Sequence, residues 1–168
     1  MLPERQTSET RSRRRNGLTS EDCIFCEIVS KKAGAAIVFE DEHSLAFLDI
    51  HPLNPGHTLV IPKKHYPSMV EMPPGEVGRV FVSVAKVMRG VMKASKADGI
   101  NIGQSNGRAA SQEVFHMHVH VIPRYVHELP GGFPDRKNAS DADLEQIGRK
   151  IKAAINDKSD LGTGMARR

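Results

Sequence analysis

Three histidines occupy alternate positions in the stretch VFHMHVHVIPR, residues 114–124. They alternate with apolar residues, in the order His116, Met117, His118, Val119, His120 and Val121. Because successive side chains of a β-strand point to opposite faces, this spacing predicts one strand with three imidazoles on one face and apolar side chains on the other. Near neutral pH an imidazole acts as a nucleophile, a proton carrier or a metal ligand. The segment therefore indicates a catalytic or metal-binding groove. The simpler alternative is a polar strand face that happens to contain histidine.

Two cysteines and two further histidines could extend this site. Cys23 and Cys26 form a C-x-x-C pair, which is typical of half a metal site or of a redox pair, with two buried thiols as the third possibility. His57 and His65 lie eight residues apart around the run TLVIP, and this even spacing puts both on one face of a regular strand. Pairs of the form H-x-H also bind zinc, so a metal trio within the histidine strand is an alternative.

The composition predicts one ordinary globular domain. The chain has 168 residues, of which 39% are apolar and 26% are charged. It contains no apolar run of roughly eighteen residues and no apolar block near residue 1, so we expect neither a membrane span nor a secretory signal. The expected location is therefore the cytoplasm.

Most of the net charge of +4 belongs to the first twenty residues. Residues 1–20 contain five arginines and two glutamates, and so carry +3 of that total. This Arg- and Ser-rich stretch is too polar to bury a core, and it predicts a disordered tail. Nonspecific attraction to nucleic acid is an alternative for the tail alone. The remaining residues predict no basic face, so nucleic acid is not an expected partner.

The hydrophobic pattern predicts the elements that must position these residues. Apolar runs predict strands at 35–42, 44–50, 56–65, 100–103 and 114–123. Apolar residues three and four apart predict a helix that begins near Pro74 and ends before Gly99. Ser140 followed by Asp143 resembles a capping box and predicts a last helix at about 140–156. The predicted fold class is α+β, with neighbouring strands paired antiparallel.

Several segments together resemble one known family. HMHVHVIPR fits the alternating motif of the histidine-triad (HIT) superfamily, and CIFCEIV, AFLDIHPLNPGHTLVIPKKH and GQSNGRAASQEVFHMHVHVIPRY resemble that family's other segments in the same order. The resemblance covers roughly residues 22–125, and it is closest to the bacterial zinc-containing members of the Hint-like branch. It implies a homodimer, a five-stranded antiparallel sheet in each subunit and a nucleoside monophosphate pocket. We accordingly divide the chain into a tail (1–20), a HIT-like catalytic domain (21–126) and a C-terminal extension (127–168).

The resemblance also implies a reaction, namely attack on the α-phosphorus of a purine nucleotide derivative such as a phosphoramidate of AMP. His118 would be the nucleophile and would form a covalent nucleotidyl-histidine that water hydrolyses, a role that neutral imidazole can fill. His120 would contact the phosphate and the leaving group, with His57 in support and Gln112 pointing at the same groups. The alternatives are a dinucleoside polyphosphate hydrolase and a nucleotide-binding protein with weak or vestigial catalysis.

Two further sets of residues acquire roles from the resemblance. Asp49 would bind the ribose hydroxyls, and the apolar slot for the base would consist of Ile24, Phe25, Ile28 and Ile50. A structural zinc ion would be held by Cys23, Cys26, His65 and His116. Two thiolates and two imidazoles make a closed four-coordinate site, which is structural rather than catalytic.

The loop before the triad departs from the family's pattern. Eleven residues before the first triad histidine the family tends to have Asn or Gln, and this chain has Ser105 followed by Asn106. The residue after Gln112 is usually Ser or Thr at the phosphate, and here it is Glu113. All three are candidate nucleotide contacts. A carboxylate near an anionic phosphate weakens binding by about 1 kcal/mol when it is partly solvated. Glu113 therefore predicts reduced activity, a side chain turned away, or a preference for cationic leaving groups such as amines.

Overall fold

The computed structural model describes residues 20–128 and 138–157. The predicted tail lies outside these ranges except for Ser20, and so do residues 129–137 and 158–168 of the predicted C-terminal extension. The elements in chain order are η1 Ser20–Asp22, α2 Ile24–Val29, β1 Ile37–Glu40, β2 Ser44–Leu48, β3 Thr58–Pro62, η2 Met69–Glu71, α3 Pro74–Ser95, β4 Gly99–Gly103, η3 Arg108–Ala110, β5 Val119–Arg124 and α4 Asp141–Asn156. Within the described ranges, no helix is long and apolar enough to cross a membrane.

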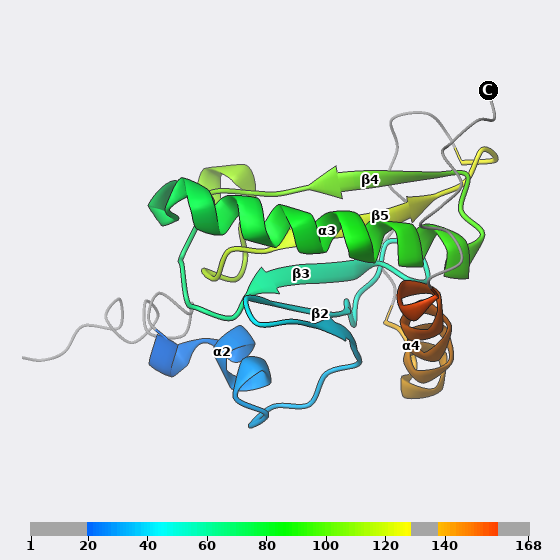
Figure 1. Ribbon diagram of the computed structural model, residues 1–168, viewed down its shortest axis with the longest axis horizontal. Coiled ribbons are helices and arrows are strands. Elements are labelled where there is room, and N and C mark those ends of the chain that lie inside the picture. The colour runs from blue at the N-terminus through cyan, green and yellow to red at the C-terminus, as the bar shows by residue number, and fades with distance from the viewer. Residues whose placement is uncertain (1–19, 129–137, 158–168) are drawn as a thin grey trace, which may run out of the picture.

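Five strands form one antiparallel sheet, as predicted (Figure 1). Their order across the sheet is β1-β2-β3-β5-β4. β1, β2 and β3 are neighbours in chain order, as the predicted antiparallel pairing of neighbouring strands requires. The chain then passes through α3 to the far edge, where β4 lies, and β5 returns between β4 and β3. This order places the histidine-bearing strand in the interior of the sheet, directly beside β3.

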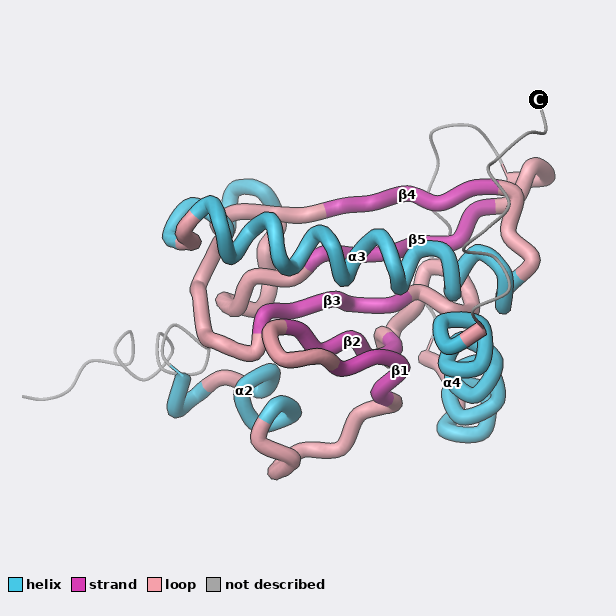
Figure 2. The backbone as a smooth tube through the Cα atoms, viewed as in Figure 1, coloured by secondary structure: helices cyan, strands magenta, loops and turns pink. Residues whose placement is uncertain are grey.

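The two faces of the sheet are covered unequally. The long helix α3 runs alongside the strands and packs on one face, and α4 packs against α3 and β1 (Figures 1 and 2). The short helix α2 covers the other face. Alternate residues of β2 and β3 divide between the two sides: Ala46, Leu48 and Val60 belong to the larger core under α3, and Leu45, Phe47, Leu59 and Ile61 to the smaller cluster under α2.

The register between β3 and β5 decides which way the histidines face. His120 lies opposite Leu59, and Val119 lies opposite Val60. Because cross-strand partners share a face, His120 lies on the α2 side and Val119 enters the core under α3. Met117 and Val121 are fully buried in that same core, as the alternation predicts.

The predicted strand at 114–123 was wrong in its first five residues, because β5 begins at Val119. β3 ends at Pro62, which has no N–H to donate to a ladder with the triad segment. The carbonyl of Pro62 instead accepts a hydrogen bond from His116 Nε2 at 2.8 Å. The backbone N–H of Met117 bonds to the carbonyl of Tyr66 instead. His116 and His118 therefore share the side opposite Met117 without belonging to a strand.

The prediction that His57 and His65 lie in one strand was also wrong. β3 covers only Thr58–Pro62, so His57 precedes it and His65 follows it, at opposite ends. The two imidazoles consequently belong to different clusters.

The two long helices follow their sequence signals at the start. Pro74 is the first residue of α3, where a missing N–H has no cost. The helix does not stop at a glycine, because it ends at Ser95 and Lys96 adopts the left-handed conformation with φ of 54°. Ser140 caps α4 by accepting a hydrogen bond from the backbone N–H of Asp143, as the capping box predicts.

The contact between α3 and α4 permits a test of packing. A methyl group on Gly90 of α3 would collide with Cγ1 of Ile155 on α4, whereas one on Gly78 of the same helix would meet no atom. We expect Gly90→Ala to lower the free energy of unfolding by about 1–3 kcal/mol through overpacking. Gly78→Ala is the control and should raise it by up to about 1 kcal/mol, because alanine favours the helix. Urea unfolding of both variants makes the comparison, and equal shifts would contradict the packing argument.

Candidate active site and metal-ligand cluster

A cavity of about 350 Å³ opens on the α2 side of the sheet. Most of its wall is apolar, with few polar groups, as in small-molecule binding sites. Its lining residues come from α2 and the segment between α2 and β1, from the end of β2 with the loop that follows, from β3, and from the triad with the loop before it: Ile24, Phe25, Ile28, Gly34, Ala35, Phe47, Leu48, Asp49, Ile50, His51, Leu59, Ser111, Glu113, Val114, His118 and His120.

All four residues predicted for the base slot lie in this wall. Phe25 packs edge-on against Phe47 at 5.3 Å between ring centroids. Ile24 and Ile50 are 46% and 59% exposed, which is unusual for large aliphatic side chains at the rim of a cavity. A flat apolar ligand between them would remove both from water.

His118 and His120 face each other in the cavity, with ring centroids 5.0 Å apart. His118 Nδ1 lies 2.7 Å from the backbone carbonyl oxygen of His116. A carbonyl can only accept, so Nδ1 of His118 carries the proton and donates it. In the neutral ring the lone pair is therefore on Nε2, and that is the atom that can attack an electrophile.

A buried chain of contacts orients His120. The backbone N–H of Leu53 donates to Nδ1 of His57 at 3.2 Å, and Nε2 of His57 lies 2.9 Å from Nδ1 of His120. Because Nδ1 of His57 accepts from Leu53, the proton of the neutral His57 ring is on Nε2. This N–H donates to Nδ1 of His120. Neutral His120 then carries its own proton on Nε2. Asp49 Oδ2 is 3.5 Å from His57 Nδ1, a longer contact than that of Leu53.

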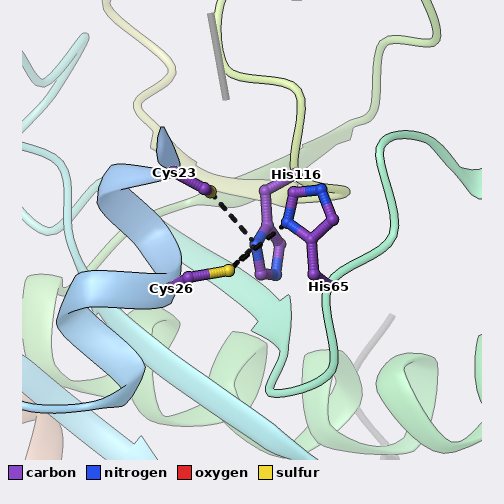
Figure 3. Close-up of side chains that lie close together, drawn as sticks. All are labelled: Cys23, Cys26, His65 and His116. Carbon is purple, nitrogen blue, oxygen red and sulfur yellow. Dashed lines mark hydrogen bonds between the residues drawn. The ribbon is translucent and has the colours of Figure 1, made fainter. Parts of the chain in front are cut away.

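A second group of four side chains converges near the start of α2 (Figure 3), and the ring of Phe25 lies edge-on to one of them, His116. Cys23 and Cys26, at the start of α2, point toward His65 and His116, and one ligand atom from each of the four lies within 4.8 Å of all the others. Nδ1 of His116 is 3.5 Å from both sulfurs, and Nδ1 of His65 is 3.3 Å from Cys26 Sγ. Zinc bonds of about 2.3 Å to sulfur and 2.0 Å to nitrogen put neighbouring ligand atoms of a tetrahedron about 3.5 Å apart. The four residues therefore fit a tetrahedral zinc ion.

Burial favours the uncharged forms of His116 and Cys26 in this cluster. It lowers the pKa of His116 to about 4, with the neighbouring His65 and His118 acting in the same direction. It also raises the pKa of the Cys26 thiol to about 12, and Cys23 adds to this shift. A divalent cation reverses this preference for the thiols, because it stabilises the thiolate that binds it. Nε2 of His116 donates to the Pro62 carbonyl, the usual outer partner of a ligating imidazole.

Comparison with known proteins identifies the family. The HIT domain profile matches residues 30–127. The chain belongs to the HIT family. An uncharacterised HIT-like protein of Methanocaldococcus jannaschii is 47% identical over 130 residues, which is 77% of this chain and 98% of that relative. The adenylylsulfatase HINT3 of Arabidopsis thaliana is 41% identical over 103 residues, which is 61% of this chain and 52% of the relative.

Solved HIT structures share the fold. A hypothetical histidine triad nucleotide-binding protein from Sulfolobus tokodaii has a TM-score of 0.74 at 36% identity, over 79% of this chain and 91% of that one. A zinc-bound histidine triad family protein from Mycobacterium smegmatis has a TM-score of 0.71 at 38% identity, over 82% and 95%. HIT proteins bind nucleotides and are generally nucleotide hydrolases or transferases.

Four of the predicted catalytic and nucleotide-binding residues do not line the cavity: His57, which contacts it through His120, and Ser105, Asn106 and Gln112 of the loop before the triad. The buried side chain of Gln112 accepts from the N–H of Gly107 and donates to the carbonyls of Pro67 and Val114. Asn106 accepts from the backbone N–H of Met69, and Ser105 stands beside it. These side chains shape the loop before the triad. Gly107 has φ of 84° there, a conformation that favours glycine.

Glu113 does line the cavity. Its side chain is exposed, and among the described residues its carboxylate makes no hydrogen bond or ion pair. Glu113, which departs from the family pattern, therefore places a solvent-exposed carboxylate in the same cavity as the two imidazoles.

The sequence interpretation missed several lining residues. Phe47 and Leu59 could have been found, because the alternation of β2 and β3 puts them on the face opposite Ala46 and Val60. His51 and Ser111 carry no such signal, because both lie in loops without periodicity. The backbone N–H of His51 donates to Asp49 Oδ1 at 2.9 Å, which orients the carboxylate at the cavity wall.

The two neighbouring triad histidines should have opposite tautomers. We expect neutral His118 to carry its proton on Nδ1, which donates to His116, and neutral His116 to carry its proton on Nε2, which donates to Pro62. Long-range ¹H–¹⁵N correlation spectra distinguish the two forms at about pH 8, above the ordinary imidazole pKa of about 6.5. An Nε2-protonated His118 would show that its nucleophilic nitrogen is not the one inferred here.

Proposed function

We propose that this HIT protein is a nucleotide hydrolase that attacks the α-phosphorus of a purine nucleoside monophosphate derivative, most simply a nucleoside phosphoramidate. The observation that carries the proposal is the 2.7 Å bond from His118 Nδ1 to the His116 carbonyl, which leaves the Nε2 lone pair of a cavity-lining imidazole as the nucleophile. The Arabidopsis relative is an adenylylsulfatase by name, which supports chemistry at an adenylyl phosphorus.

The reaction has two steps. Nε2 of His118 forms a bond to phosphorus while the bond from phosphorus to the leaving amine breaks, and the departing amine takes the proton from Nε2 of His120. His57 keeps that proton on the correct nitrogen by donating to Nδ1 of His120. Water then attacks the phosphorus of the nucleotidyl-histidine and gives one proton to Nε2 of His120, while the bond from phosphorus to Nε2 of His118 breaks. This step releases the nucleoside monophosphate and restores both neutral imidazoles.

The remaining cavity residues would bind the nucleotide. The apolar slot between Ile24, Phe25, Ile28 and Ile50 accepts the base. Asp49, at the end of this slot, accepts hydrogen bonds from the ribose hydroxyls. Glu113 supports a substrate whose leaving group carries a positive charge, such as a protonated amine. The side chain of Gln112 is hydrogen-bonded to the backbone of Gly107 and Pro67. This favours the second candidate, a nucleotide-binding protein with weak catalysis.

Zinc is the proposed metal for the four-residue cluster. Cys23, Cys26, His65 and His116 would hold it, and the zinc-bound Mycobacterium smegmatis structure supports this assignment. A closed set of two thiolates and two imidazoles leaves no position for substrate, so the ion would supply cohesion between α2, the loop after β3 and the triad segment.

A homodimer is the proposed assembly. β4 is an edge strand of the sheet, and Ile102 on it is 41% exposed. The outer side of α3 presents Phe81, Val82 and Met92, which are also exposed. A second copy that covered this edge and helix face would pair the open strand and bury these apolar side chains.

The covalent step gives the sharpest test of the function. Mixing excess protein with adenosine 5′-phosphoramidate labelled at phosphorus should give a transient adenylyl-protein adduct. His118→Ala should abolish it, because the Nε2 lone pair of His118 forms the bond to phosphorus. His43→Ala, which changes a histidine in the turn between β1 and β2, is the control and should leave the adduct unchanged. Tight AMP binding without an adduct in the wild type would favour the binding protein.

Glu113 can be tested through the charge of the leaving amine. We expect Glu113→Gln to lower the preference for adenosine phosphoramidates with a second, protonated amine over neutral ones by about fivefold in kcat/KM, since one exposed charge contact is worth about 1 kcal/mol. Glu42→Gln, an exposed carboxylate outside the cavity, is the matched control. An equal change for both substrate classes would contradict a role of Glu113 in selecting the leaving group.

A further inference from the structure

We propose that zinc binding at Cys23, Cys26, His65 and His116 and nucleotide binding in the cavity are coupled, so that each ligand raises the affinity for the other. This rests on the two proposed sites and adds that they communicate. The coupling runs through α2, which belongs to both sites, and through His116, a metal ligand whose backbone carbonyl accepts the bond from His118 in the cavity.

The helix α2 is the first shared element. It has six residues, and the Cys23 side chain at its start makes no capping hydrogen bond. A helix of this length is not stable by itself in water, so its position depends on what holds its side chains. Cys23 and Cys26 face the metal-ligand cluster, while Ile24, Phe25 and Ile28 line the nucleotide cavity. Whatever anchors the two thiols therefore also sets one wall of the base slot.

His116 is the second shared element. Its Nδ1 faces both cysteines, and its own backbone carbonyl accepts the bond from Nδ1 of His118. The ring of Phe25 lies edge-on to both imidazoles, with centroids 5.9 Å from that of His116 and 5.4 Å from that of His118. A shift of His116 would consequently move the nucleophile and the ring that supports the base slot.

These shared elements give the coupling its sign. Without a metal, the four ligands are held together by weak contacts between sulfur and nitrogen atoms at 3.3–3.5 Å. Coordination replaces these contacts with strong directional bonds and restricts α2. A nucleotide that binds next must order less of its own site, and a nucleotide that binds first presents better-placed ligands to zinc. Two ligands that order the same element bind with positive cooperativity.

Binding measurements on the full chain test the proposal directly. We expect AMP to bind the zinc-loaded protein about tenfold more tightly than the chelator-treated protein, and zinc affinity, measured against a chromophoric chelator, to rise by the same factor with saturating AMP. Equality of the two factors is required by thermodynamic linkage. Equal AMP affinities in the two forms would overturn the coupling alone. Absence of AMP binding to the zinc-loaded protein, or absence of zinc binding, would overturn it together with the corresponding proposed site.

Hydrogen exchange separates local coupling from general stabilisation. Metal removal should raise amide exchange in α2 while the strands β2 and β3 keep their protection, and AMP should restore part of the protection of α2. Loss of protection throughout the sheet would mean that zinc holds the whole fold and would overturn the local coupling.

A matched pair of variants completes the test. His65→Ala removes a zinc ligand that does not line the cavity, and we expect it to weaken AMP binding to the level of the chelated protein. Lys64→Ala changes the neighbouring exposed residue and keeps all four ligands, so AMP and zinc affinities should remain those of the wild type. Unchanged AMP affinity in folded His65→Ala would overturn the proposal.

Discussion

The hydrogen bond from Nε2 of His116 to the carbonyl of Pro62 is the contact on which both candidate sites depend. Pro62 has no N–H, so the ladder between β3 and β5 cannot pass it, and the ring of His116 takes the carbonyl that remains. This bond turns Nδ1 of His116 toward the two cysteines. The backbone carbonyl of the same residue accepts a hydrogen bond from Nδ1 of His118. One residue just before β5 thus orients the metal ligands through its side chain and the nucleophile through its backbone carbonyl.

The unequal covering of the sheet explains where a ligand can enter. On one face, α3 and α4 close a continuous core with Met117, Val119 and Val121 fully buried, so the backbone that carries the triad cannot shift easily. On the other face a helix of six residues covers a much smaller cluster. The rigid side fixes the imidazoles, and the thinly covered side leaves the space that a base and ribose would fill.

The charges around the cavity are unusual for a phosphate site. None of the residues that line it within the described part of the chain is Lys or Arg, and two of them, Asp49 and Glu113, are carboxylates. A phosphate group there would meet the Nε2–H of His120 and the hydroxyl of Ser111 as donating side chains. Binding would therefore depend mainly on burial of the apolar base. Modest affinity for the nucleotide product is compatible with turnover, because tight product binding slows release.

The local pattern of residues determined most of the fold and part of the site. The period of two in HMHVH determined which side chains enter the core, because alternation is a property of any extended backbone. The helical periods and the capping serine determined α3 and α4 to within a few residues. The members of the metal cluster were named from resemblance, and the structure brings all four together.

Only the tertiary structure decided the rest, because hydrogen-bond partners distant in sequence leave no local pattern. Because β3 ends at Pro62, His116 and His118 lie before β5 and not within it. Because β3 is short, His57 and His65 lie at its opposite ends and belong to different clusters. The side chain of Gln112 donates to the backbone carbonyls of Pro67 and Val114 instead of lining the cavity, whereas Glu113 lines it. The tautomers of the triad likewise depend on the carbonyls of Pro62 and His116, since these atoms fix which nitrogen of each ring keeps its proton. The sequence by itself determined which side chains could do chemistry and which way they face, and the tertiary contacts determined which atoms of them are placed to do it.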